Sequence, residues 1–139
     1  MADRLSKEGR RRNMQQIRSK DTQPEKRVRS LLHSMGFRFR LHRKDLPGNP
    51  DIVLPRYRVA IFVNGCFWHQ HVDCKEAHLP ATNTAYWKAK LEKTVTRDKV
   101  NKELLENDGW VVLTVWECEL LNPTSLSNWL FAEIRGLNN

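Results

Sequence analysis

Apolar and polar positions follow a helical spacing in the first well-patterned segment of the chain, residues 22–36. Apolar side chains recur there every three or four residues, at Val28, Leu31, Leu32 and Met35. The preceding run Thr22-Gln23-Pro24-Glu25 has the pattern of an N-terminal capping box with proline early in the helix. We therefore predict a helix that begins at this run and ends at Gly36.

Strand-like patterns follow this helix. Phenylalanine alternates with arginine over residues 37–40, which predicts a first strand. After a turn at residues 46–50, residues 51–54 begin a second strand. The continuous apolar run over residues 59–63 is typical of a strand that is buried on both faces.

A long helix, another strand and a last helix complete the pattern. Residues 84–107 are predicted to form a helix capped by Thr84, with an apolar side of Trp87, Leu91, Val95, Leu104 and Leu105. Residues 110–116 form the next buried strand, and Thr124 begins a helix whose inward positions are Leu126, Trp129, Leu130 and Ile134. Strands, a crossover helix and a further strand imply a mixed sheet with helices on its faces. We predict a single α/β domain over residues 1–139.

Charge is distributed unevenly along the chain. The 139 residues include 24 Lys and Arg against 16 Asp and Glu, a formal net charge of +8. Residues 1–20 alone hold seven basic side chains against two acidic ones. Such an arm either keeps a protein in solution or binds a polyanion, and concentrated basic charge is typical of nucleic-acid binding. We therefore expect residues 1–21 to form a basic arm that contacts nucleic acid through Arg10, Arg11, Arg12 and Arg18.

Cysteine usage and hydropathy indicate the compartment. No apolar segment near the start has the pattern of a secretory signal, and none approaches the length of a membrane span. Three cysteines, an odd number, argue for reduced thiols or metal binding rather than a disulfide framework. We expect a cytoplasmic protein with no membrane partner, associated with the nucleoid if the source is bacterial.

Thiol and imidazole side chains provide a candidate zinc site. The four ligands that tetrahedral closure requires are supplied by Cys66, His71, Cys74 and Cys118. Their spacing is not that of a standard zinc finger or ribbon, so three ordinary buried cysteines are the competing interpretation. His69 and His78 are alternative histidine ligands. Four protein ligands would make the zinc structural rather than catalytic.

Three further residues carry candidate chemistry. Asp51 follows Pro50 at the head of an apolar strand, where it either caps a turn or binds a hard cation such as Mg²⁺. Glu25 is explained by the capping box alone. His69 lies between an aromatic pair and a candidate zinc ligand, where it either supports a ligand or acts as a general base.

Aromatic side chains occur where a polar loop is expected. Phe67 and Trp68 lie within the candidate metal loop, and in a basic protein exposed rings of this kind are suited to stacking on bases. Trp87 opens the long helix nearby. Because Trp87 also falls on the apolar side of that helix, it is either a third stacking ring or a core residue.

In combination, several motifs closely resemble the very short patch repair endonucleases. The shared motifs are Asn49-Pro50-Asp51, Gly65-Cys66-Phe67-Trp68-His69, Tyr86-Trp87-Lys88-Ala89-Lys90, Arg97-Asp98, and the segment from Gly109-Trp110 to Trp116-Glu117-Cys118. The resemblance runs from about Arg12 to Cys118. It implies a restriction-endonuclease-like fold and an enzyme that nicks DNA on the 5′ side of the thymine in a T·G mismatch. Such mismatches arise by deamination of 5-methylcytosine, so the resemblance also implies a functional link to a cytosine-5 DNA methyltransferase and to mismatch-repair proteins.

The resemblance implies roles for individual residues. Asp51 would bind the catalytic Mg²⁺, supported by Glu25 at longer range and by the backbone carbonyl of Val63. His69 would be the general base for the attacking water. The structural zinc would be held by Cys66, His71, Cys74 and Cys118. A wedge beside the mismatch would be formed by Phe67, Trp68 and Trp87. Met14 would approach the DNA from the opposite groove, and Lys90 is retained from the family pattern.

The chain departs from the family pattern in three places. Val63-Asn64 replaces Thr-His before the glycine, so a second histidine at the phosphate is lost while a backbone ligand is kept. Thr94 replaces the asparagine that helps to read the mismatch. The spacing between His71 and Cys74 is one residue longer.

Three functions therefore stay open, with the first preferred. They are a Mg²⁺-dependent, mismatch-selective DNA nicking enzyme, a non-catalytic zinc module that binds distorted DNA, and a nuclease of the same fold with another specificity. Asp51 and His69 favour catalysis over the binding module. Thr94 is the main support for the third function.

Overall fold

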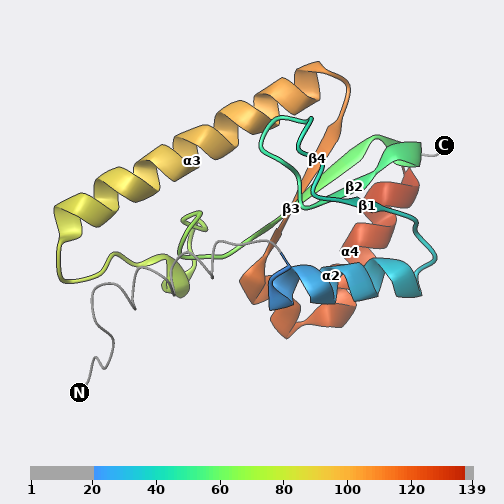
Figure 1. The fold of residues 1–139 in the computed structure, drawn as a ribbon. Helices are drawn as coiled ribbons and strands as arrows, with labels where there is room; N and C mark the ends of the chain where they lie inside the picture. The colour runs from blue at the N-terminus through green and yellow to red at the C-terminus, as the bar shows by residue number, and fades with distance from the viewer. Residues whose placement is uncertain (1–20, 137–139) are drawn as a thin grey trace.

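Four strands form one mixed sheet in the computed structural model, which describes residues 21–136 of the chain (Figure 1). The strands are β1 (Arg40–Leu41), β2 (Ile52–Leu54), β3 (Val59–Asn64) and β4 (Val111–Trp116). They lie in the order β1-β2-β3-β4, antiparallel from β1 to β3 and parallel between β3 and β4. A parallel pair needs a crossover, and α3 (Thr84–Asn107) lies within it. The predicted mixed α/β fold is confirmed.

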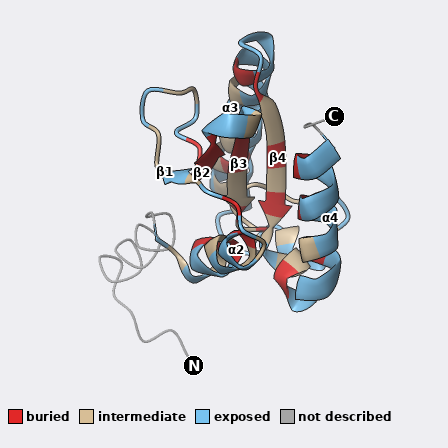
Figure 2. Cartoon of the chain, turned by 90° about the vertical axis from the view of Figure 1, so that its right-hand side faces the viewer, coloured by how far each residue is buried: buried red, intermediate tan, exposed pale blue. Residues whose placement is uncertain are grey.

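Helices cover both faces of this sheet. The helices α2 (Gln23–Ser34) and α4 (Pro123–Arg135) lie on one face, and α3 runs along the other (Figures 1 and 2). Three short 3-10 helices complete the described chain: η1 (Pro55–Tyr57), η2 (Lys75–Ala77) and η3 (Glu117–Leu121). None of the helices within residues 21–136 has the length and apolar character needed to cross a membrane.

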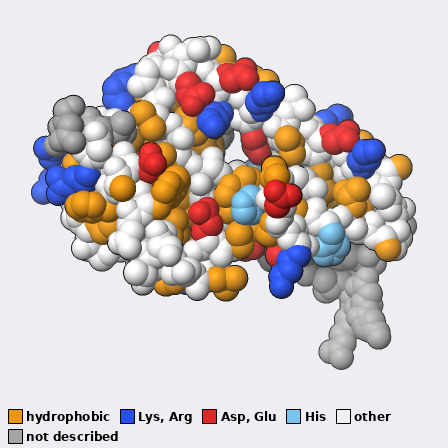
Figure 3. Space-filling model, turned by 180° about the vertical axis from the view of Figure 1, so that it is seen from behind, with side chains coloured by type: hydrophobic (Ala, Val, Ile, Leu, Met, Phe, Trp, Pro, Cys, Tyr) orange, Lys and Arg blue, Asp and Glu red, His pale blue; other side chains and the backbone are white. Residues whose placement is uncertain are grey.

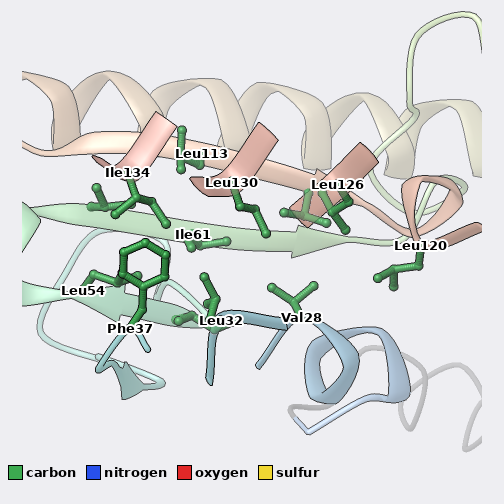
Figure 4. Packing of buried hydrophobic residues seen from close by; sticks show 13 residues of the cluster. Val28, Leu32, Phe37, Leu54, Ile61, Leu113, Leu120, Leu126, Leu130 and Ile134 are labelled. Atoms are coloured by element: carbon green, nitrogen blue, oxygen red, sulfur yellow. The ribbon is translucent and has the colours of Figure 1, made fainter. Parts of the chain in front are cut away.

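Apolar side chains form a core on each face of the sheet. The larger core joins β2, β3 and β4 to α2 and α4 and includes Val28, Leu32, Phe37, Leu54, Ile61, Leu113, Leu120, Leu126, Leu130 and Ile134 (Figure 4). The smaller core lies on the α3 side and contains Val53, Ala60, Leu105 and Trp110. Because strand side chains alternate between faces, β2 and residues 59–63 of β3 must be apolar to fill both cores. The uninterrupted apolar run that predicted β3 has this cause.

The first strand is shorter and lies later than the predicted strand over residues 37–40. Gly36 adopts a left-handed φ of +84° after α2, and the Phe37 N–H donates to the Leu32 carbonyl at 3.1 Å. This hydrogen bond closes the helix end, so the Phe37 N–H is unavailable to the sheet. Its ring enters the larger core instead.

The long helix is less buried than its apolar positions predicted. Leu91 and Leu105 are buried, but Val95 and Leu104 are exposed, and so is Trp129 on α4. A helix of 24 residues spans about 36 Å, whereas the six residues of β4 span about 20 Å. The sheet therefore cannot cover all of α3, and the N-terminal part of the helix lies against the loop that follows β3. Thr84 is the first helical residue rather than the cap, which is Asn83.

Candidate active site and metal centre

Asp51 lies immediately before β2, and its side chain is hydrogen-bonded to β3. Its Oδ2 accepts a hydrogen bond from the Val63 N–H at 2.8 Å. The register pairs Ile52 with Ile61, so the carboxylate of Asp51 reaches the end of β3 just before the chain leaves the sheet. The antiparallel pairing of β2 with β3 thus brings Asp51 and Val63 together.

Burial strongly perturbs the Asp51 carboxyl. Burial is the main reason that the pKa of Asp51 is raised to about 7, and the adjacent Glu25 raises it further. The Val63 N–H and the nearby His69 act in the opposite direction and favour the carboxylate. Two carboxyl groups that face each other in a buried position favour a proton or a cation between them.

Glu25 contributes to the site and to the helix cap. It is only 4% exposed, and its Oε2 accepts a hydrogen bond from the Asp21 N–H at 2.8 Å. Thr22 is the N-cap, as predicted, and its Oγ1 accepts from the Glu25 N–H at 3.4 Å. The Thr22 half of the predicted capping box forms, but the Glu25 side chain accepts from the Asp21 N–H and not from the Thr22 N–H that a capping box requires. Neither this hydrogen bond nor the interaction of Glu25 with Asp51 follows from the capping pattern.

His69 forms a close pair with an acidic residue of α3. Its Nδ1 lies 2.6 Å from Asp98 Oδ2, and both side chains are partly buried. Because Asp98 takes Nδ1, the opposite ring nitrogen, Nε2, is left to exchange a proton. Asp98 had appeared only within a shared motif, with no role assigned. A pairing across 29 residues depends on how α3 docks, which no local pattern indicates.

These groups line one large cleft. The cleft has a volume of about 1190 Å³ and includes Glu25, Asp51, His69 and Asp98 in its wall. Asn64 and Thr94 line it too, together with basic residues of α3, namely Arg97, Lys99 and Lys102. On one face of the molecule, histidine, acidic and hydrophobic side chains adjoin in a central region with lysine and arginine side chains around it (Figure 3).

Residues beyond the ends of β3 and β4 form a second centre. The parallel register pairs Asn64 with Trp116, so Cys66 and Cys118, each two residues further on, emerge side by side. The donor atoms of Cys66, His71, Cys74 and Cys118 all lie within 4.8 Å of one another. The strand pairing therefore explains the long gap in sequence before Cys118.

The geometry of this thiol and imidazole cluster suits a tetrahedral cation. His71 Nδ1 lies 3.7 Å from Cys66 Sγ and 3.4 Å from Cys118 Sγ. Zinc bond lengths of about 2.0–2.3 Å place tetrahedral ligand atoms roughly 3.5–3.8 Å apart. Burial, with smaller effects from the neighbouring thiols, raises the pKa of Cys66 to about 12. A bound cation would stabilise the thiolates, so this cluster can hold a metal ion.

The two alternative histidines do not join the cluster. His69 is paired with Asp98, and the exposed His78 lies 2.8 Å from the Lys75 carbonyl through Nδ1. The His71 ring instead stacks on Trp116 at a centroid distance of 4.2 Å and an interplanar angle of 10°. That stacking fixes the plane of the one imidazole in the cluster.

The aromatic residues of the metal loop and of α3 form one cluster. The ring centroids of Phe67 and Trp68 lie 5.2 Å apart, and Trp87 lies 5.7 Å and 5.9 Å from them. Tyr86 extends the cluster at 5.4 Å from Trp87, and Lys90 Nζ lies about 6 Å from the Trp68 ring. Trp87 belongs to neither core. It is therefore part of a half-buried aromatic surface that borders the cleft.

The sequence singled out several further residues besides those of the aromatic cluster. Met14, Arg10, Arg11, Arg12 and Arg18 lie outside the described residues. Thr94 lines the cleft, but its hydroxyl donates to the Lys90 carbonyl within the helix at 3.3 Å. Asn64 is 9% exposed at the end of β3.

Comparison with known proteins adds sequence relationships to this geometry. The family model described as DNA mismatch endonuclease Vsr matches residues 2–76. A Type II nicking enzyme, V.XorIIP of Xanthomonas oryzae pv. oryzae, is 58% identical over 120 residues, covering 86% of this chain and 88% of that protein. The DNA mismatch endonuclease Vsr of Escherichia coli is 44% identical over 128 residues, covering 92% of this chain and 81% of that protein.

A solved structure supports the fold alone. The catalytic domain of the homing endonuclease I-Bth0305I superimposes with a TM-score of 0.57 and 24% sequence identity. The match covers 81% of this chain and 93% of that domain. The architecture is therefore shared with a nuclease domain of distant sequence.

Proposed function

Because this chain belongs to the Vsr family of DNA mismatch endonucleases and is a DNA nicking endonuclease, we propose that it cuts at T·G mismatches. The cut lies 5′ of the thymine in a mismatch left by deamination of 5-methylcytosine, it depends on Mg²⁺, and it initiates very short patch repair. One observation carries this proposal: Asp51, Glu25 and the His69–Asp98 pair line a single cleft. The fold is taken to be restriction-endonuclease-like.

Asp51 and Val63 provide the oxygen ligands for the catalytic cation. The Asp51 carboxylate is fixed beside Val63 by the 2.8 Å hydrogen bond, and the carbonyl of Val63 is the second candidate ligand. Glu25 interacts with Asp51 and adds negative charge at longer range. When bound, Mg²⁺ neutralises charge that develops on the phosphate and orients a water. The negative charge of the buried Asp51 and Glu25 carboxylates suits a bound Mg²⁺.

His69 acts as the general base. Asp98 holds Nδ1 at 2.6 Å, so Nε2 is free to take a proton from the attacking water. The resulting hydroxide forms a bond to phosphorus as the bond to the leaving oxygen breaks. Asp98 stabilises the imidazolium that forms and keeps its ring oriented, while Asn64 stands where the family pattern has a second histidine.

The aromatic cluster recognises the faulty base pair. Inserting rings between bases costs a few kcal/mol of unstacking and costs least where pairing is already faulty. Phe67, Trp68 and Trp87 contact each other edge to face, so they would enter the duplex as one wedge. Lys90 lies beside the rings and Thr94 lines the cleft. Met14 would approach from the opposite groove, and the arginines of residues 1–21 would contact phosphates.

The cysteine cluster holds one structural zinc. Four protein donors complete a tetrahedral shell, so no open position remains for a substrate. Cys66 and Cys118 each lie two residues beyond the end of a strand, β3 or β4, and the loop that holds Cys66 also carries Phe67, Trp68 and His69. Zinc would therefore fix the wedge and the general base relative to the strand ends.

The cellular setting follows from the substrate. The mismatch arises from 5-methylcytosine, so we place the enzyme beside a cytosine-5 DNA methyltransferase and mismatch-repair proteins. The expected location is the bacterial cytoplasm, at the nucleoid.

A nicking assay on labelled duplexes tests this function. Duplexes that contain T·G, G·T or fully paired sites are incubated with and without Mg²⁺. We expect one cut, 5′ of the mismatched thymine, only with Mg²⁺. Asp51→Asn should abolish the cut, whereas Asp45→Asn, a carboxylate on the same segment that pairs with Arg43, should not. Equal cutting of paired DNA would favour another specificity, and mismatch binding without any cut would favour the non-catalytic module.

A further inference from the structure

A polar cluster attached to Glu25 has no part in the chemistry described above. Its centre is Arg29, whose side chain is 17% exposed. Arg29 Nη2 lies 2.6 Å from Asp21 Oδ1, 3.3 Å from Glu25 Oε2 and 3.1 Å from His42 Nε2. A single guanidinium nitrogen thus contacts three side chains from two parts of the chain.

This cluster is not a second cation site. The donor atoms of Asp21, Glu25 and His42 lie within 4.8 Å of one another, which by itself resembles a set of metal ligands. However, Arg29 already contacts all three donors with a permanent positive charge. A cation there would meet the repulsion of the guanidinium, so the three donors form a pocket for Arg29.

The arrangement carries local costs that packing alone does not explain. Arg29 Nε is buried and has no hydrogen-bond partner among the described residues, and an unpaired buried donor is unfavourable. Asp21 and His42 also have left-handed φ values of 64° and 52°, a conformation that Asp and His adopt more readily than most residues. The unpaired Nε of Arg29 is therefore the feature that packing alone leaves unexplained.

The cluster connects the two carboxylates of the active site. Arg29 lies one helical turn after Glu25 on α2, and the Asp21 N–H also donates to Glu25 Oε2. On the other side, the His42 N–H donates to the Asp51 backbone carbonyl at 3.2 Å. Arg29 therefore bridges the helix that carries Glu25 and the strand end that carries Asp51.

We propose that Arg29 is a positioning residue for the catalytic cation, which acts by holding the Glu25 carboxylate in place beside Asp51. The proposal rests on the proposed function, because it takes these two carboxylates to serve Mg²⁺. A positioning role and a purely electrostatic role of Arg29 predict opposite changes in cation affinity when Arg29 is replaced. A positive charge close to a cation site weakens cation binding, so its removal alone would tighten binding. Loss of positioning weakens binding, because Glu25 is released.

The test compares three variants. Arg29→Met removes the charge and the hydrogen bonds but keeps the aliphatic stem, and Arg29→Lys keeps the charge but loses the planar fork. Arg43→Met is the matched control, because it breaks an exposed ion pair with Asp45. Mn²⁺ affinity is measured by electron paramagnetic resonance on the protein as purified. The Mg²⁺ concentration for half-maximal nicking is measured in parallel.

We expect Arg29→Met to weaken Mn²⁺ binding and raise the half-maximal Mg²⁺ concentration about tenfold, the effect typical of residues that orient metal ligands. The rate at saturating Mg²⁺ should fall less, Arg29→Lys should restore part of the affinity, and Arg43→Met should match the parent. In addition, Arg29→Met should cause no further loss in a Glu25→Gln background, because both changes remove the same contact.

Unchanged or tighter Mn²⁺ binding in folded Arg29→Met protein would overturn the proposal. If Arg29→Met does not fold, Arg29→Lys decides, and an unchanged Mn²⁺ affinity overturns it. Failure of the underlying function has a different signature. In that case Asp51→Asn binds Mn²⁺ as the parent does, or the parent does not nick the T·G duplex, whatever Arg29 does.

Discussion

The raised pKa of Asp51 predicts an unusual dependence of stability on pH. Because the pKa is about 7 in the folded protein against an ordinary value of 3.8, the folded state holds a proton that the unfolded state releases. The stabilisation from this proton is complete below about pH 4 and is lost as the pH rises through 7. Asp51→Asn cannot titrate and should lack this loss.

The magnitude follows from the two pKa values. A difference of about three pH units corresponds to roughly 4 kcal/mol, and partial solvent access reduces this to about 2–4 kcal/mol between pH 4 and pH 8. Added Mg²⁺ should offset the loss progressively above pH 6, since the carboxylate binds the cation and the acid does not. A carboxylate site that selects Mg²⁺ would thus be unfavourable for folding and favourable for binding at the same pH.

Chemical denaturation from pH 4 to pH 8 measures this effect. The buffers are freed of Mg²⁺ on a resin rather than with a soluble chelator. A metal on the cysteine cluster is released at low pH by protonation of the thiols, and because this affects parent and Asp51→Asn alike, the difference between the two proteins is the quantity compared. Asp45→Asn is the control, because Arg43 lowers the pKa of Asp45 to about 2 and Asp45 therefore does not titrate in this range. The reasoning is refuted if parent and Asp51→Asn lose stability equally as the pH rises.

Four other changes separate the remaining roles. Asp98→Ala should reduce the nicking rate about 10- to 100-fold at unchanged DNA affinity in gel shifts, since a charge-assisted hydrogen bond contributes roughly 1.5–3 kcal/mol; an unchanged rate would exclude Asp98 from catalysis. Trp68→Ala should weaken binding to the T·G duplex about 10- to 100-fold and to paired DNA much less, as stacking contributes roughly 1–3 kcal/mol per ring. The control Trp129→Ala, which removes an exposed ring on α4, should change neither affinity. Equal losses on both duplexes would contradict the proposed aromatic wedge. Cys118→Ser should give insoluble or strongly destabilised protein, because structural zinc contributes on the order of 10 kcal/mol, and elemental analysis should find one zinc per parent chain; active protein without zinc would contradict this. Deletion of residues 1–18 should weaken binding to all duplexes and flatten its salt dependence; unaltered affinity would leave the arm a solubility tail.

Local patterns in the sequence were sufficient for most elements of the fold. The capping run at Thr22, the apolar run of β3 and the long helical segment each reflect interactions within a few residues or the burial of a whole segment. These signals predicted α2, β3 and α3 and a mixed sheet. They failed for β1, where the hydrogen bond that closes α2 engages Phe37, and for the exposed side of α3, where a helix longer than its sheet leaves Val95 uncovered.

The candidate site divides in the same way. The residue types and motifs of the sequence were enough to propose Asp51, His69 and the cysteine cluster, because thiols, imidazoles and carboxylates have strong chemical preferences. The contact of Arg29 with Glu25 joins two residues that are four positions apart on one helix, so their spacing is visible in the sequence. Tertiary structure alone decided that Asp98 approaches His69 and that Arg29 contacts His42, because each of these contacts depends on the angle and register at which a helix packs on the sheet. Packing of that kind is set by the whole apolar core, so the partners of a polar side chain across elements leave no periodic trace in the sequence.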